Sequence, residues 1–129
     1  MNPKPLIYLA LVASIILLTS HSLAGVYHLY WSYWWFDVLM HFWGGLTVGL
    51  VASWAFLRFR PEVPYNRSMF IVAVLAAVLV VGSAWEVFEY LNKIIGSHEA
   101  YTLDVVNDLT LDAFGALAAA AVALRKRHG

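Results

Sequence analysis

The chain has 129 residues, of which 62% are hydrophobic and only 12% are charged. Soluble domains hold about 45–50% apolar and about 25% charged residues, so a soluble fold of this size could not bury so much apolar surface. The absence of Cys excludes disulfides, thiolate metal sites and cysteine nucleophiles. The sequence also has no basic nucleic-acid patch and no internal repeat, so we expect residues 1–129 to form a single transmembrane domain with the lipid bilayer as its solvent.

Four apolar stretches are long enough to cross a bilayer, which takes about 20 residues in a helix. They cover approximately residues 6–27, 36–57, 69–91 and 105–124. These stretches are too long for strands and do not alternate, so they predict an all-α, polytopic membrane protein with four transmembrane helices. The first stretch has an alternative interpretation as a signal peptide, because Ser22-Leu23-Ala24 would suit the peptidase.

Basic residues are divided unequally between the two sides of the predicted bundle. With four spans, the N-terminus, the loop after the second span and the C-terminus share one side. That side holds Lys4, Arg58, Arg60, Arg67, Arg125, Lys126 and Arg127, whereas the other side holds Lys93. Lys and Arg favour the cytoplasmic side, so the pattern predicts an N-in/C-in protein of a bacterial inner (cytoplasmic) membrane.

Acidic residues gather at the opposite, outer side. Six of them lie at the outer ends of the second, third and fourth spans, with one histidine among them: Asp37, His41, Glu86, Glu89, Asp104, Asp108 and Asp112. At about 1.5 Å per helical residue, Asp112 lies about 20 Å from Arg125, hence roughly 10 Å below the outer surface of a core about 30 Å thick. Three helices therefore place ionisable groups at a similar depth.

Helical spacing predicts that these groups face one another. The acidic faces continue inward as small residues, which let membrane helices approach closely: Gly44, Gly45, Val48 and Ala52 in the second span, Gly82 in the third, and Gly115, Ala116, Ala119 and Ala123 in the fourth. Bulky residues on the remaining faces are expected to contact lipid: Leu39, Trp43, Leu46, Phe114 and Leu117. The acids should therefore meet inside the bundle.

Six carboxylates cannot all ionise together in a partly dehydrated bundle, so the cluster must hold protons, bind a cation, open to water, or combine these. Carboxylates with one imidazole suit Mg²⁺, Mn²⁺, Ca²⁺, Fe²⁺ or Zn²⁺, and the spacing selects none of these divalent ions. The candidate metal ligands are Asp37, His41, Glu86, Glu89, Asp108 and Asp112. Among them, His41, Glu86 and Asp112 are candidate catalytic groups, although no known catalytic motif is present and enzymatic activity stays open.

Three functions remain compatible with this pattern. The acidic site binds a divalent cation and acts on, or holds, a cell-envelope or lipid-linked substrate. Alternatively, the acids only tie helices together in a structural or accessory membrane subunit. A third interpretation is a cation or proton pathway, which would need an oligomer because the cytoplasmic halves of the spans hold few polar groups.

The motif order resembles that of the VanZ-like small membrane proteins. The resemblance rests on Asp37-x3-His41-Phe42, on Glu86 late in the next span, and on Asp108-x3-Asp112-x2-Gly115-Ala116, across residues 30–120. The Trp85-Glu86 pair, Glu89 and Asp104 look closer to the YjdF-type inner membrane proteins. The resemblance implies a small integral membrane protein, and VanZ itself is linked to teicoplanin-class glycopeptide resistance.

Overall fold

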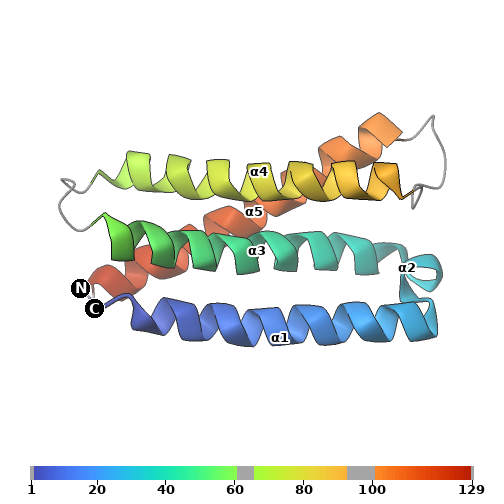
Figure 1. Ribbon diagram of the computed structural model, residues 1–129, viewed down its shortest axis with the longest axis horizontal. Helices are drawn as coiled ribbons and strands as arrows, with labels where there is room; N and C mark the ends of the chain where they lie inside the picture. Colours follow the sequence, from blue (N-terminus) through green and yellow to red (C-terminus); the bar gives the residue numbers. More distant parts are fainter. Residues whose placement is uncertain (1, 61–65, 93–100, 129) are drawn as a thin grey trace.

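The computed structural model describes residues 2–60, 66–92 and 101–128, which are helical apart from short connections (Figure 1). The helices are α1 (Lys4–Tyr27), α2 (Leu29–Ser32), α3 (Trp34–Phe59), α4 (Arg67–Leu91) and α5 (Tyr101–His128). α1, α3, α4 and α5 are each long and apolar enough to span a membrane. The prediction of an all-α protein with four candidate spans is therefore confirmed.

Local sequence signals explain where several helices begin and end. Pro5 lies in the first turn of α1, where its fixed φ suits a helix and its missing N–H costs no bond. Asn66 caps α4, because its side chain accepts hydrogen bonds from the backbone N–H groups of Ser68 (2.9 Å) and Met69 (3.2 Å). His28 ends α1 in a left-handed conformation (φ 52°, ψ 40°) and turns the chain into α2.

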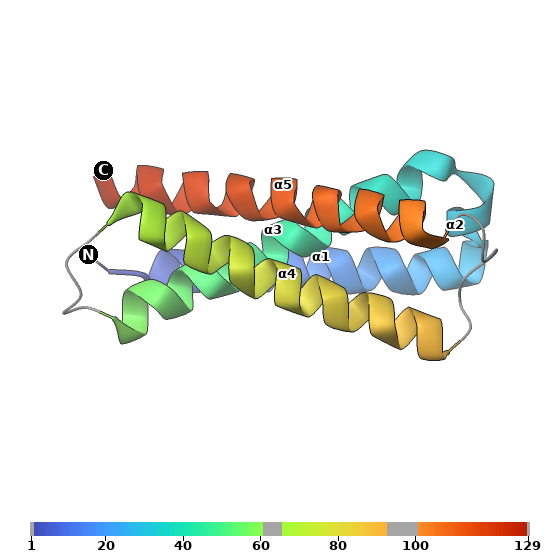
Figure 2. The same cartoon turned by 90° about the horizontal axis from the view of Figure 1, so that it is seen from above.

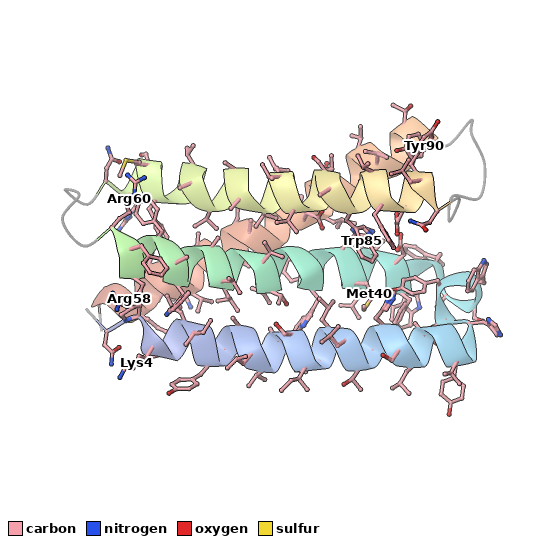
Figure 3. All side chains as sticks on the ribbon, in the orientation of Figure 1. Lys4, Met40, Arg58, Arg60, Trp85 and Tyr90 are labelled. Carbon is pink, nitrogen blue, oxygen red and sulfur yellow. The ribbon has the colours of Figure 1, made fainter. Side chains whose placement is uncertain are left out.

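The helices form two unequal layers. α3 lies between α1 and α4, and α5 crosses behind α3 and α4 (Figure 1). α4 and α5 cross each other at an angle, as the two perpendicular views show (Figure 1 and Figure 2). Lys4, Arg58 and Arg60 lie at the end with the termini, whereas Trp85 and Tyr90 lie toward the opposite end (Figure 3).

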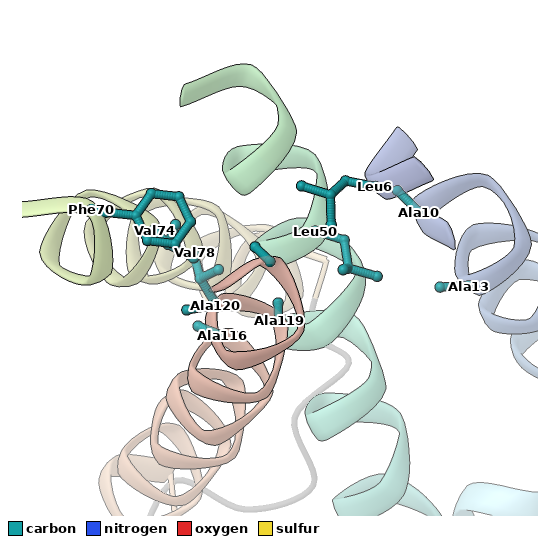
Figure 4. Packing of buried hydrophobic residues seen from close by; sticks show 11 residues of the cluster. Leu6, Ala10, Ala13, Leu50, Phe70, Val74, Val78, Ala116, Ala119 and Ala120 are labelled. Carbon is teal, nitrogen blue, oxygen red and sulfur yellow. The ribbon is translucent and has the colours of Figure 1, made fainter. Parts of the chain in front are cut away.

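An apolar core lies in the half of the bundle nearer the termini. Leu6 and Ala10 of α1, Leu50 of α3, a phenylalanine and two valines of α4, and four alanines of α5 are almost fully buried there (Figure 4). Large apolar side chains elsewhere, such as Val80 (70% exposed), point outward on faces that lipid would cover. α1 therefore packs as a part of the bundle through its own buried residues.

Backbone contact between α3 and α5 determines where the acidic groups meet. A Cβ placed on Gly45 would collide with the backbone of Asp112, and one placed on Gly115 would collide with the backbone of Phe42. A Cβ on Gly49 would lie 2.7 Å from the Cβ of Ala119. The two helices can approach this closely only because these positions lack side chains.

The structure corrects two expectations about helix faces. A Cβ placed on Gly44 would meet no atom within 4 Å, so Gly45 alone of this pair lies at the contact with α5. Trp43 does not face lipid, because its indole N–H donates to the carbonyl of Ala13 in α1 at 2.9 Å. Leu46 is likewise half-buried against the core, whereas the other bulky residues are exposed as expected: Leu39, Phe114 and Leu117.

Candidate metal centre

His41 lies at the centre of the acidic cluster. It is one helical turn outward from Gly45, so the close approach of α3 and α5 brings its ring against two carboxyl groups of α5. The Nε2 atom lies 3.3 Å from Oδ2 of Asp108 and 3.6 Å from Oδ1 of Asp37. The Nδ1 atom lies 3.4 Å from Oδ1 of Asp112. Nε2 of the imidazole therefore faces two carboxyl groups, and Nδ1 faces a third.

One side of this ring has the spacing of a metal site. Among the described residues, Asp37, His41 and Asp108 each offer one ligand atom, and these atoms lie within 4.8 Å of one another. With metal–ligand bonds of about 2.0–2.1 Å, neighbouring ligands of a tetrahedral ion lie roughly 3.3 Å apart. The two distances from Nε2 are close to that value, so these three residues could hold a small divalent ion.

Asp112 has a different role from that of Asp37 and Asp108. It faces Nδ1, the nitrogen on the far side of the ring from the candidate metal position. A proton held on Nδ1 and donated to a carboxylate leaves the lone pair on Nε2, which is the tautomer that binds metal. Without an ion, an imidazolium would donate from both nitrogens and tie α3 to α5. The geometry thus supports a metal ligand or a helix tie.

Two further carboxyl oxygens are buried without a partner. Asp108 and Glu86 are only 2% and 5% exposed, and Oδ1 of Asp108 and Oε1 of Glu86 have no hydrogen-bond partner within the described part of the chain. Glu86 lies one turn outward from Gly82, whose missing side chain makes room for the carboxyl of Asp112. Buried acceptors left without a donor cost free energy, so this part of the bundle is suited to a ligand or a proton.

The six predicted ligands thus occupy three kinds of position. Asp37, His41 and Asp108 form the group with metal-ligand spacing, and Asp112 holds the opposite ring nitrogen. Glu86 is buried nearby and Glu89 is half-buried, but neither belongs to that group; Glu89 accepts a hydrogen bond from the Trp85 indole at 2.9 Å.

A family model described as "Predicted membrane protein (DUF2238)" matches residues 2–129. The chain belongs to the DUF2238 family. No curated protein and no solved structure matches it. The family description and the four long apolar helices agree that this DUF2238 protein is an integral membrane protein.

Sequence reasoning did not predict that four side chains of this DUF2238 protein lie together at the outer end. They are here called the outer rim and are defined as His21, Tyr30, Trp85 and Glu89. The Tyr30 hydroxyl lies 3.0 Å from Nδ1 of His21, and the His21 ring meets the Trp85 ring edge-on at 6.4 Å between centroids. The i, i+4 spacing of Trp85 and Glu89 was the one sequence signal for this group.

Tyr30 stays a hydrogen-bond donor in this setting. Burial, followed by the nearby charges of Asp37 and Glu89, raises the pKa of Tyr30 to about 12. The phenol is therefore protonated at neutral pH and can donate to Nδ1 of His21. The rim thereby links α1, α2 and α4 beside the carboxyl of Asp37, at the outer edge of the candidate metal centre.

Proposed function

We propose that this DUF2238 protein binds a divalent cation through Asp37, Nε2 of His41 and Asp108, and that it acts on or holds a cell-envelope or lipid-linked substrate at that site. The observation that carries the proposal is the division of the His41 ring, with two potential co-ligands at Nε2 and an orienting carboxyl at Nδ1. A bound ion would supply a Lewis acid or an activated water at its open position.

The position of the centre supports a membrane-associated substrate. Its ligands come from the outward halves of α3 and α5, at the end of the bundle away from the termini. The similarity of the motifs to VanZ-like and YjdF-type proteins also favours an envelope role. In the described inner halves of these helices the buried polar groups are the hydroxyls of Thr47, near the middle of α3, and Ser53, and neither is ionisable, which favours a site open to one side over a conducting pathway.

We further propose the N-in/C-in orientation in a bacterial inner membrane, and it makes a direct prediction. Ser32 and Ser68 are both exposed and lie at opposite ends of the bundle, and the native chain has no Cys. Ser32→Cys should react with a membrane-impermeant thiol reagent added to intact cells, whereas Ser68→Cys should react only after the cells are opened. Labelling of Ser68→Cys alone in intact cells would reverse the orientation. Ser97 was predicted from the sequence as a second position for outer labelling, and it lies outside the described residues.

Metal analysis of the purified protein tests the proposed centre. We expect about one divalent ion per chain after dialysis against trace metals, and an at least tenfold weaker affinity in Asp108→Asn, which removes one charged ligand. Asp104→Asn is the matched control, since Asp104 is exposed one turn away on α5 and lies outside the ligand group. Equal metal content in all three proteins would reject the centre, and a folded metal-free protein would favour the helix-tie alternative.

A further inference from the structure

We propose that the substrate group recognised beside the metal centre is an ammonium group with N–H donors, held against Glu86 inside the outer rim. The inference rests on the proposed function, because it names the chemical class of the ligand at that site. It is carried by three observations about the outer ends of the helices: their charge, the unpartnered oxygen of Glu86 and the aromatic rim next to it.

The charge of the outer end favours a cationic ligand. Six carboxyl groups lie there, and within the described ranges the nearby side chains that can carry positive charge are His41 and, at the outer rim, His21. The described Lys and Arg residues all lie near the opposite end: Lys4, Arg58, Arg60, Arg67, Arg125 and Lys126. One divalent ion would balance only two carboxylates, so the site would still repel a free phosphate or carboxylate and attract a second positive charge.

The Glu86 carboxyl specifies a hydrogen-bond donor. Its Oε1 atom is buried and has no partner among the described residues, although Glu86 lies in the electrostatic field of Glu89, His41 and Asp112. An ionised carboxylate oxygen only accepts hydrogen bonds, so a ligand that pairs with Oε1 must supply a donor. An ammonium group supplies both the N–H and the positive charge, and bonds of this charge-assisted kind are the strong ones.

The outer rim beside Glu86 also suits such a group. Trp85 precedes Glu86 in the chain and is 43% exposed, and Glu89 lies one turn further outward. Tyr30 and Trp85 both contact the His21 ring, so two electron-rich rings and a carboxylate lie together at the membrane surface. Aromatic faces attract ammonium groups by cation–π interaction. Lipid headgroups bearing a primary amine reach this level of a membrane.

Binding of defined lipids tests the inference. The full chain is purified in a neutral detergent and an amine-free buffer, and phosphatidylethanolamine, phosphatidylcholine and phosphatidylglycerol with identical acyl chains are titrated in by native mass spectrometry. We expect phosphatidylethanolamine to bind about tenfold more tightly than the other two. Phosphatidylcholine carries the same charges without N–H donors, so it separates hydrogen bonding from charge. Equal binding of all three lipids would overturn the inference.

Variants connect the preference to Glu86. Glu86→Gln should abolish the preference for phosphatidylethanolamine while metal is still bound, because Glu86 is outside the ligand group. Asp104→Asn removes the same charge from an exposed position and should keep the preference. Should Glu86→Gln fail to fold, Glu89→Gln at the half-buried rim should weaken the preference several-fold. A preference that survives in both glutamine variants contradicts the proposal.

Two further experiments identify the source of the ammonium group. Free ethanolamine is added at the same concentration as the lipid. If it displaces phosphatidylethanolamine and raises the melting temperature equally well, the ligand is a soluble amine, and the ammonium group is still what Glu86 recognises. Lys93 lies outside the described residues and is the chain's own rival ammonium group. A lipid preference that appears only in Lys93→Gln would mean that the chain supplies this ligand itself, and would overturn the proposal.

The outcome also separates this inference from the proposed function. Asp108→Asn removes a metal ligand and leaves Glu86 in place. Metal binding without any preference for phosphatidylethanolamine would reject the ammonium site alone. A preference for phosphatidylethanolamine in a protein that binds no divalent ion would reject the metal centre alone.

Discussion

Gly45→Ala should destabilise the bundle by about 1–3 kcal/mol, the range found for overpacking of well-packed interiors. The added methyl would meet the backbone of Asp112 on α5, and a backbone cannot rotate away as a side chain can. The helices must separate, which also moves Asp112 away from Nδ1 of His41. The unfolding midpoint in mixed micelles with increasing dodecyl sulfate measures the loss, and the metal content should fall with it.

Gly44→Ala is the matched control for this substitution. It makes the same chemical change one residue away, where nothing lies within 4 Å of the new methyl. Alanine favours a helix over glycine by up to about 1 kcal/mol, so this variant should be unchanged or slightly more stable. Of the two neighbouring substitutions, Gly45→Ala alone is thus expected to lower the stability. Equal stability of Gly44→Ala and Gly45→Ala would contradict the close contact between α3 and α5.

Divalent metal should raise the thermal stability of the purified protein, and a chelator should lower it. A ligand that binds the folded state alone stabilises it by about 2.7 kcal/mol at a hundredfold excess over Kd. Asp108→Asn should lose most of this response, whereas Asp104→Asn should keep it, as judged by melting in detergent with Mn²⁺, Zn²⁺ or Ca²⁺. The response should weaken toward a pH of about 5, because protons compete with the metal for imidazole and carboxylate ligands.

The helix-tie alternative predicts a different pattern in the same measurements. Metal and chelator should then leave the melting temperature unchanged. Asp108→Asn should be nearly neutral, since an amide keeps the shape of the side chain and still forms hydrogen bonds to His41. This result would reject the metal centre and leave the acids as links between α3 and α5.

The sequence was sufficient to predict the spans, but not their ends. Long apolar runs have one stable form in lipid, so the helices followed from composition. Their bounds are wider than the apolar runs; α3, for example, covers Trp34–Phe59 against an expected 36–57. A helix continues into the headgroup layer as long as its backbone bonds are satisfied, and hydropathy does not report that point. The short helix α2 depends on the left-handed turn at His28, a conformation that is uncommon for residues other than glycine and that no sequence pattern marks here.

Helix faces were predicted less well than helices. Small residues occur on both sides of α3 near Gly44 and Gly45, and these neighbours point about 100° apart, so composition could not decide which one contacts α5. Trp43 was assigned to lipid because it is bulky. Its indole N–H, however, needs an acceptor, and the Ala13 carbonyl on α1 provides one. In both cases the position of the neighbouring helix, α5 for Gly45 and α1 for Trp43, decides which face is packed.

The location of the acidic cluster could be predicted from the sequence, but the orientation of its side chains could not. Depth and spacing were enough to bring His41, Asp108 and Asp112 together. The side of the imidazole that each carboxyl faces depends on side-chain rotation and on the offset between α3 and α5, which one sequence does not encode in any visible pattern. The link between His21 and Tyr30 also joins separate segments, and neither residue forms part of a recognisable motif.

The sequence separation between His41 and Asp112, 71 residues, has a consequence for how the protein is made. Helices enter the membrane in chain order, so α3 and α4 are inserted while α5 is still being synthesised. In that interval His41 lacks the carboxyl groups of Asp108 and Asp112 that α5 brings, and an unpaired charged side chain within a membrane helix costs up to about 2.5–3.5 kcal/mol on insertion scales. Insertion of the last helix completes the structure, and a nascent chain that stops before Tyr101 should be a substrate for membrane quality control.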